Sequence, residues 1–263
     1  MSFDPKAGTH THGNGLFLGE ASKAAYEPAT IAGWLQRNGF GAAAVAGFDV
    51  SGVSGFVASD AAFVLLVFTG TNSLEDWGIN LKARPVADAA GLPGKVHRGF
   101  AAALDKVWAS EVKPKLGGPR PLWVAGHSLG GALAVLAAAR WAIVDGQPVQ
   151  GLYTYGQPRV GNHDFRDAMD VALAGRYFRY VNDRDIVPRV PPAALGYRHA
   201  GHSYLFTEDC AIREMSAAQE AIFALKRALE EARHMDELKG RNVVESVGDH
   251  GMDSYLGCLR KGV

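Results

Sequence analysis

The chain has 263 residues, of which 48% are apolar, so it is long enough to bury a substantial α/β core without disulfides. Lysine plus arginine and aspartate plus glutamate both number 27, which makes the formal net charge zero. Nucleic acids and anionic membrane surfaces are bound by concentrated positive charge, so this balance argues against either as the main partner. We see no linker, repeat or low-complexity tract and expect a single domain over residues 1–263.

The N-terminal residues 1–15 are polar and contain glycine, so we expect a flexible leader in which His10 and His12 are solvated. They lack the apolar core of a signal peptide, and we therefore expect a cytoplasmic protein unless an export signal was removed or is unrecognised. Cys210 and Cys258 lie far apart and match no metal-binding spacing. We expect free thiols at both positions rather than a disulfide.

The first quarter of the chain predicts helical structure followed by three strands. Apolar spacing over residues 21–38 favours a helix that is interrupted near Pro28. Strands are expected over 43–50, 55–58 and 63–68, with glycine, serine and aspartate at the turns. The third segment is apolar on both faces, which is typical of a central strand covered on both sides.

A polar turn, residues 69–72, follows the predicted central strand directly. The end of a central strand is where an oxyanion donor belongs in this kind of sheet, so the N–H and hydroxyl of Thr71 are candidates. An ordinary turn would have the same composition, and both interpretations stay open at this point.

Leu74, Trp77 and Leu81 follow at helical spacing, after a capping-box pattern at residues 73–76. Two interpretations are open for this short amphipathic segment. It packs on the core, or it is a mobile lid whose apolar face covers a pocket and turns outward on lipid.

The strongest local pattern runs from residue 122 to 137. An apolar run is followed by Gly126, His127, Ser128, Leu129 and Gly130 and then by alanines and leucines, which predicts a buried strand, a tight turn and a helix. This context is typical of a nucleophile elbow, in which the serine hydroxyl is exposed at a strained turn and the next N–H faces a developing oxyanion. The predicted nucleophile is therefore Ser128, with Leu129 as an oxyanion donor.

Strands and helices alternate on both sides of this segment. Residues 97–112 favour a helix, 151–155 a buried strand, 163–173 a helix and 176–181 another strand. This alternation predicts an α/β fold with a mostly parallel sheet. We expect a structural role for His97, which opens the first of these helices.

The loop over residues 182–188 follows a predicted strand and carries Asp183 and Asp185. A carboxylate at the carboxyl end of a strand is well placed to orient a histidine, and both aspartates qualify. A further strand is expected over residues 197–206.

The base should follow the acid in the chain, because nucleophile, acid and histidine occur in that order in α/β-hydrolases. His199 and His202 fall in a predicted strand, and His234 falls in a helix-favouring stretch over residues 211–238. His250 alone stands in a glycine-flanked loop, just before a short terminal helix, where its ring is free to reach the serine.

Six motifs, in order and at compatible spacing over roughly residues 60–260, resemble the class 3 lipases of the fungal-lipase-like family, which have the α/β-hydrolase fold. They are residues 68–72 (Phe-Thr-Gly-Thr-Asn) with 76–77 (Asp-Trp), 96–100 (Val-His-Arg-Gly-Phe), 126–132 (Gly-His-Ser-Leu-Gly-Gly-Ala), 155–161 (Tyr-Gly-Gln-Pro-Arg-Val-Gly), 181–188 (Val-Asn-Asp-Arg-Asp-Ile-Val-Pro) and 249–250 (Asp-His) with Tyr255.

The resemblance implies a Ser-His-Asp triad of Ser128, His250 and Asp185. It selects Asp185 over Asp183 because the family's acid stands directly before the Ile-Val-Pro sequence. It further implies that Thr71 and Leu129 form an oxyanion hole. It also implies a short lid that contains Leu74, Trp77 and Leu81. The helix-favouring residues 211–238 depart from the familiar pattern and are expected to form a helical insertion.

The function implied is a carboxylester hydrolase, foremost a lipase that cleaves acylglycerols through an acyl-enzyme and contacts a lipid interface transiently. The alternatives are an esterase for soluble short-chain or aryl (feruloyl-type) esters and a non-catalytic binding protein of the same fold. No metal or cofactor is expected, because a serine, a histidine and an aspartate suffice for this chemistry.

Overall fold

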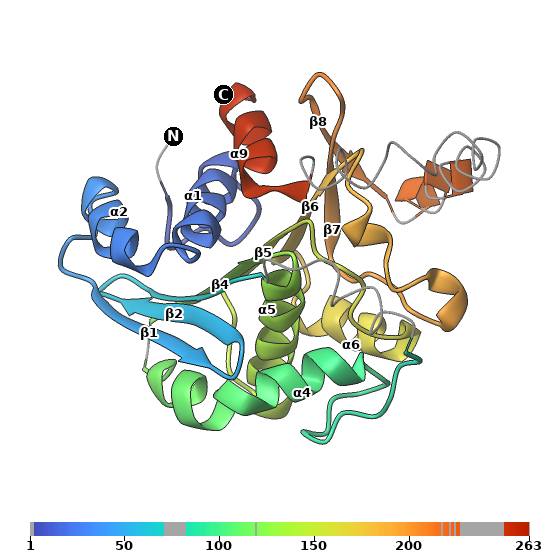
Figure 1. Ribbon diagram of the computed structural model, residues 1–263, viewed down its shortest axis with the longest axis horizontal. Coiled ribbons are helices and arrows are strands. Elements are labelled where there is room, and N and C mark those ends of the chain that lie inside the picture. The colour runs from blue at the N-terminus through green and yellow to red at the C-terminus, as the bar shows by residue number, and fades with distance from the viewer. Residues whose placement is uncertain are drawn as a thin grey trace.

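The computed structural model describes residues 3–70, 83–118, 120–216, 218–220, 222–223, 225–226 and 250–262. Within these residues the centre of the fold is one sheet of eight strands, whose order in the sheet is the order in the chain (Figure 1). The strands are β1 Ala44–Val50, β2 Val53–Ser59, β3 Val64–Phe68, β4 Leu122–His127, β5 Gly151–Tyr155, β6 Tyr177–Asn182, β7 His202–Phe206 and β8 Ile212–Met215.

Helices surround the sheet. The α-helices are α1 His12–Ala24, α2 Ile31–Arg37, α4 Arg98–Val107, α5 Leu129–Ala139, α6 His163–Ala172 and α9 Met252–Lys261. Short 3-10 or π-helical turns are η1 Pro28–Thr30, η2 Trp108–Val112, η3 Lys113–Lys115, η4 Arg140–Val144, η5 Val187–Arg189 and η6 Ala193–Leu195.

The sheet is mixed, with a parallel centre. Strands β3 to β7 pair in parallel, whereas β1, β2 and β3 pair antiparallel at one edge and β7 and β8 at the other. Helices α4, α5 and α6 lie in the connections from β3 to β6, as the alternating sequence pattern predicts, whereas β6 and β7 are connected through the short turns η5 and η6. The predicted α/β-hydrolase fold with a mostly parallel central sheet is confirmed.

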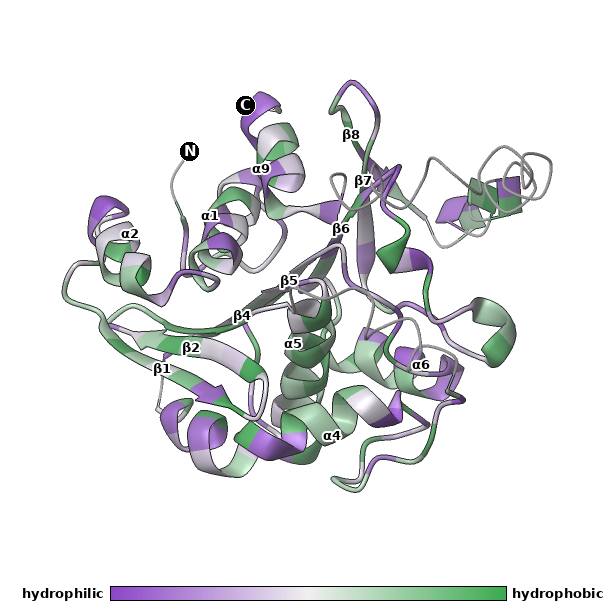
Figure 2. Ribbon diagram, viewed as in Figure 1, coloured by the Kyte–Doolittle hydropathy of each residue, from purple (hydrophilic) through white to green (hydrophobic). Residues whose placement is uncertain are grey.

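Two hydrophobic cores lie on the two faces of this sheet. Helices α1, α2 and α9 cover one face, and α4, α5 and α6 cover the other (Figure 1). Strand β3 shows why both faces are apolar in sequence: Val64 and Leu66 belong to the core under α5, and Leu65 and Val67 to the core under α1. Helix α5 is apolar along its length in Figure 2 and buried from its second residue to its last.

The N-terminal segment is packed, so the prediction of a flexible leader is wrong. The ring of Phe3 stacks on Phe17 of α1 with centroids 4.1 Å apart, and His10 stacks on Tyr204 of β7 at the same distance. Helix α1 begins at His12, inside the supposed leader, and the hydroxyl of Thr11 caps it. The rings that hold this segment down are distant in sequence, which is why local polarity was misleading.

The region before the C-terminal helix also differs from expectation. The helix predicted over 211–238 does not begin there, because Ile212–Met215 forms β8 against β7, and helical turns follow only after Ser216. Residues 227–249 lie outside the described part of the chain. The strand predicted over 197–206 is confined to His202–Phe206, the part that pairs with β6.

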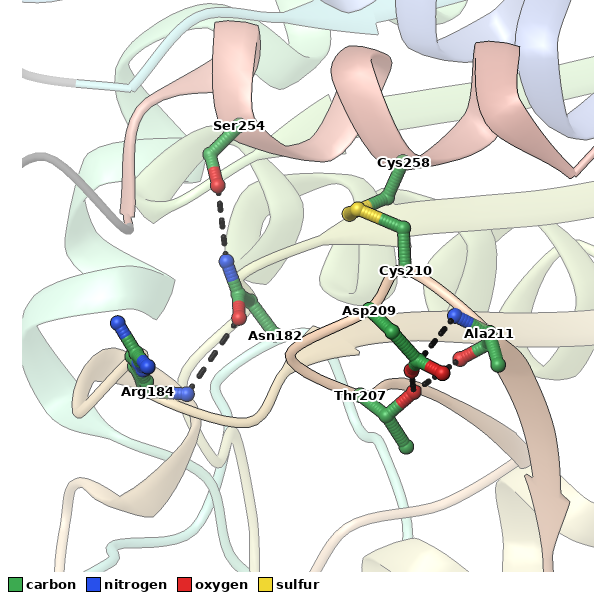
Figure 3. The surroundings of a disulfide bond; sticks show 8 residues. All are labelled: Asn182, Arg184, Thr207, Asp209, Cys210, Ala211, Ser254 and Cys258. Carbon is green, nitrogen blue, oxygen red and sulfur yellow. Dashed lines mark hydrogen bonds between the residues drawn. A yellow bond between two sulfur atoms is a disulfide. The ribbon is translucent and has the colours of Figure 1, made fainter.

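Cys210 and Cys258 form a disulfide, which corrects the prediction of free thiols. Cys210 lies in the turn between β7 and β8, and Cys258 lies in α9 (Figure 3). Next to the disulfide, the side-chain amide of Asn182 donates to Ser254 of α9 over 2.9 Å. The bond thus fastens α9 to the edge of the sheet across a 48-residue separation.

We predict that replacing both cysteines by serine lowers the free energy of unfolding by about 2–4 kcal/mol, because a long closed loop in the unfolded chain is released. Urea denaturation with and without reductant measures the loss. The double variant is its own control, since reductant should have no further effect on it. Equal stability of the oxidised wild type and the variant would contradict the prediction.

Buried histidines should make the fold sensitive to acid. Burial lowers the pKa of His10 to about 4. Burial and, as a second cause, the nearby His250 lower the pKa of His127 to about 3. Burial also lowers the pKa of His199 well below its ordinary value. In the unfolded chain these rings titrate near about 6.5. Between that pH and the lowered values the unfolded chain binds protons that the folded chain does not, so stability falls as the pH drops.

We predict a loss of about 1.4 kcal/mol per pH unit below about pH 6 for the fully buried His127, and a smaller one for the partly exposed His10. Urea midpoints measured from pH 7 to 4.5 give the slope. His10→Phe, which can keep the stacking on Tyr204, should flatten it, whereas His163→Gln on the exposed face of α6 should not. An unchanged slope in His10→Phe would refute this assignment.

Candidate active site

Ser128 stands in the turn between β4 and α5 with φ 59° and ψ −127°, a conformation that non-glycine residues rarely adopt. The turn requires two glycines. A Cβ on Gly126 would lie 2.3 Å from the carbonyl oxygen of Gly130, and a Cβ on Gly130 would lie 2.3 Å from that of Phe68. The predicted strand, turn and helix are all present, so the local geometry is that of a nucleophile elbow.

The structure brings the three predicted triad residues together. The Oγ of Ser128 lies 2.7 Å from Nε2 of His250, and Nδ1 of that ring lies 2.8 Å from Oδ2 of Asp185. All three are buried, with exposed fractions of 2%, 5% and 1% in the order Ser128, His250, Asp185. A hydrogen-bonded line from a hydroxyl through an imidazole to a carboxylate can move the hydroxyl proton onto the ring.

Further donors hold the carboxylate of Asp185. The N–H of Val187 donates to Oδ1 over 2.9 Å, and the hydroxyl of Tyr255 in α9 donates to Oδ2 over 2.6 Å. The other candidate acid, Asp183, does not contact His250; its carbonyl accepts from Arg189. The loop pattern did not distinguish the two aspartates, but the geometry shows that Asp185 is the one that contacts His250.

The ring of His127 points away from the Ser128 hydroxyl and joins three segments. Its Nε2 lies 2.7 Å from the carbonyl oxygen of His250, which can only accept, so Nε2 carries the hydrogen. Its Nδ1 then accepts from the Tyr26 hydroxyl over 2.7 Å, and that hydroxyl accepts from the N–H of Gly70 over 3.0 Å. Burial raises the pKa of Tyr26 to about 12, so the hydroxyl keeps its proton.

Tyr26 was not found by sequence reasoning. It lies in the short irregular stretch between α1 and η1, and it is 101 residues from His127. No local pattern marks a tyrosine in such a stretch. Its position matters because it ties the turn after β3 to the elbow and, through His127, to the backbone of the His250 loop.

The oxyanion donors and the lid are described only in part. As the first residue of α5, Leu129 offers an N–H that the helix's own hydrogen bonds leave unpaired. Gly70 lies against the serine, since a Cβ on it would come within 3.0 Å of the Cβ of Ser128. The predicted donor Thr71 and the predicted lid residues Leu74, Trp77 and Leu81 lie outside the described residues.

A groove of about 410 Å³ opens at the same end of the sheet. Tyr26, Thr69 and Gly70 line it, together with residues 47–49 of β1 and 54–55 of β2. A groove of this size in contact with the turn after β3 can accept part of an organic substrate.

The remaining histidines have other contacts. His97 caps α4 by accepting from the N–H of Phe100, as the predicted structural role requires. His199 lies 2.7 Å from the carbonyl of Pro188, and His202 lies 3.5 Å from Glu214. His234 lies outside the described residues. Among the described residues of the chain, no three His, Cys, Asp or Glu side chains lie together as a metal site. No helix formed by these residues is long and apolar enough to cross a membrane.

We predict that Tyr26→Phe slows the reaction of Ser128 with a fluorophosphonate about tenfold. The variant leaves the N–H of Gly70 and Nδ1 of His127 without a partner, and one hydrogen bond contributes about 1–1.5 kcal/mol. Tyr197→Phe is the matched control, because that hydroxyl donates to Ala83 instead. An unchanged labelling rate in folded Tyr26→Phe would show that this network does not position the serine.

Comparison with known proteins agrees with these features. The family model described as lipase (class 3) matches residues 65–195. A lipase of Rhizomucor miehei is 38% identical over 154 residues, which are 56% of this chain and 42% of that protein. A secreted mono- and diacylglycerol lipase of Fusarium solani is 37% identical over 163 residues, 59% of this chain and 47% of that protein.

The fold is also similar to solved structures. A triacylglycerol lipase whose catalytic centre is described as a serine protease triad superposes with a TM-score of 0.63 and 28% identity, covering 80% of this chain and 88% of that one. The chain spans less than half the length of the Rhizomucor miehei and Fusarium solani relatives. By its motifs, its sheet and its elbow, the chain belongs to the class 3 lipase family.

Proposed function

We propose that this protein is a serine carboxylester hydrolase that acts on acylglycerols, that is, a lipase. The observation that carries the proposal is the buried line of hydrogen bonds from Ser128 through His250 to Asp185, with the serine on a nucleophile elbow. The family supports the substrate class, because two of the relatives named above are a triacylglycerol lipase and a mono- and diacylglycerol lipase.

In the first half of the proposed reaction, Ser128 Oγ attacks the ester carbonyl carbon while Nε2 of His250 takes the hydroxyl proton. Asp185 holds the ring in the tautomer whose Nε2 lone pair faces the serine. The N–H of Leu129 and, by the family resemblance, that of Thr71 stabilise the oxyanion. The imidazolium then gives its proton to the departing alcohol, which leaves an acyl-enzyme.

In the second half, water attacks the acyl-enzyme carbonyl and His250 takes its proton. Collapse of the second oxyanion returns the proton to Ser128 Oγ and releases the carboxylic acid. The carboxylate of Asp185, held by Tyr255 and the N–H of Val187, keeps its orientation through both halves. Its role is to stabilise and orient the ring rather than to accept the proton.

The proposal includes transient contact with a lipid interface through a lid formed by Leu74, Trp77 and Leu81. Their spacing on one helical face and the family resemblance support this role. A soluble ester can reach the serine without an interface, so the same triad without a functional lid would act on short-chain or aryl esters. The experiment below separates these two substrate classes.

We also propose that the chain works in an oxidising compartment or outside the cell, in place of the cytoplasmic location expected from its first residues. The Cys210–Cys258 disulfide supports this, because such bonds persist mainly in oxidising environments. The Fusarium solani relative is a secreted lipase. We further propose that residues 1–263 form one domain, since both cores share one sheet.

The test is the initial rate on p-nitrophenyl esters from acetyl to palmitoyl and on triacylglycerol below and above its solubility limit. A lipase should prefer long chains and accelerate once an interface appears. Ser128→Ala should lower kcat by about 10⁶ because the nucleophile is lost. Ser110→Ala, on the exposed η2 turn, is the matched control and should keep full activity.

A smooth profile that favours short chains would move the assignment to a soluble esterase with the same triad. Residual activity of Ser128→Ala within about tenfold of the wild type would refute the nucleophile. No turnover by wild-type protein that also fails to react with a fluorophosphonate would favour the binding-protein alternative.

A further inference from the structure

The groove of about 410 Å³ begins beside the predicted nucleophile and extends outward across the edge of the sheet. Its lining includes Gly70, on which a Cβ would lie 3.0 Å from the Cβ of Ser128. It also includes Asp49 of β1, two strands further out than β3, or about 10 Å at the usual strand spacing. If the ester bond is cleaved at Ser128, as the proposed function requires, this groove lies where one end of the substrate can extend.

Gly47 in β1 keeps the groove open, and the fold itself does not require a glycine there. Strand β1 pairs with β2 without a bulge at this point, with Gly47 opposite Phe56, and the φ of Gly47 is not positive. A Cβ on Gly47 would meet only the carbonyl oxygen of Gly55, at 3.9 Å, which is an ordinary contact. A glycine that weakens a strand without such a reason is typical of a site where a ligand approaches the backbone.

The polar groups of the groove are hydrogen-bond acceptors. Asp49 lies opposite Ser54 in the register and therefore shares a face of the sheet with Ser54 and Gly47. Its exposed carboxylate makes no ion pair or hydrogen bond with the part of the chain that the structure describes. The hydroxyl of Thr69 donates to the carbonyl of Ser54 over 3.1 Å, so the Ser54 hydroxyl donates to Oγ1 of Thr69 over 2.6 Å. With both hydrogens used, these two oxygens can only accept.

The lining excludes several kinds of occupant. No lysine, arginine or histidine is among the described residues that line the groove, so a phosphate or carboxylate would meet only acceptors and the negative charge of Asp49. An acyl chain would take water from that carboxylate without replacing it. A neutral group with several hydroxyls fits instead, because it can donate to Asp49 and Ser54 and lay its carbon atoms against Ala25 and Pro28.

We propose that this groove binds the alcohol half of the ester substrate and that this half is a neutral polyol, either glycerol or a sugar carried on glycerol. Gly47 and Asp49 are then specificity-determining residues. Gly47 leaves room for the polyol, and Asp49 accepts from one of its hydroxyls. The two sources differ in length: a sugar extends further from Ser128 than glycerol does and reaches the outer end of the groove, where Asp49 lies.

The experiment measures kcat/KM for three octanoate esters below their solubility limits: methyl octanoate, 1-octanoylglycerol and octanoyl galactosylglycerol. All three give the same acyl-enzyme, so differences in kcat/KM between them arise from the alcohol half. Each variant is compared with the wild type by its ratio of polyol ester to methyl ester. This comparison cancels the chemical reactivity of the three alcohols and does not depend on a lipid interface.

Gly47→Val places a side chain in the groove. The Cβ has room, and valine favours strands, so the variant should fold and hydrolyse methyl octanoate at the wild-type rate. Its ratio of polyol ester to methyl ester should fall at least tenfold because the groove is filled. Ala44→Val, at an exposed position of β1 outside the groove, is the matched control and should keep the wild-type ratio.

Asp49→Ala removes the acceptor without filling the groove and should lower the same ratio about tenfold, the effect of one lost hydrogen bond to a charged group. A fall for the galactosyl ester alone identifies the sugar as the occupant, and a fall for both polyol esters shows that glycerol suffices. An unchanged ratio in folded Gly47→Val or in Asp49→Ala would overturn this inference and leave the proposed function intact. Failure of the wild type to hydrolyse any of the three esters would refute the proposed function, and this inference with it.

Discussion

The close contact between β4 and α5 at Ser128 is the constraint on which the site depends. The serine keeps a positive φ because Gly126 and Gly130 let the strand, the turn and the helix approach to a distance that any side chain would prevent. Gly130 also lies against the carbonyl of Phe68 at the end of β3. The position of Ser128 is therefore fixed relative to the end of β3 and to the turn that directly follows β3.

The support of this site comes from the helices on the opposite side of the sheet from α5. Tyr26 follows α1 and reaches the elbow through His127, while Tyr255 of α9 reaches Asp185. Helices α1 and α9 pack on each other, and the disulfide fastens α9 to the turn between β7 and β8. The helices α1 and α9, which complete the core on one face of the sheet, therefore also position Asp185 and the loop that carries His250.

Two kinds of buried polar environment lie on either side of the acid loop. Around Ser128 the polar groups satisfy one another: the ring of His127 is neutral and has a partner on each nitrogen. Behind the loop, the buried Nδ1 of His199 has no hydrogen-bond partner in the described part of the chain. Inside a protein an unpaired buried polar atom is costly, so the two environments differ in how far their polar groups are satisfied.

Patterns within a few residues were sufficient for the elbow at Ser128, for β5 over Gly151–Tyr155 and for the alternation that makes the sheet mostly parallel. These follow from periodicity and from the backbone demands of glycine, which act over one turn or one strand. The Cys210–Cys258 bond, the Tyr26–His127 contact and the packing of Phe3 and His10 were decided only in the tertiary structure. Each joins segments that come together only when the sheet forms, because hydrogen bonds, ring stacking and disulfides require proximity in space, which local sequence does not encode.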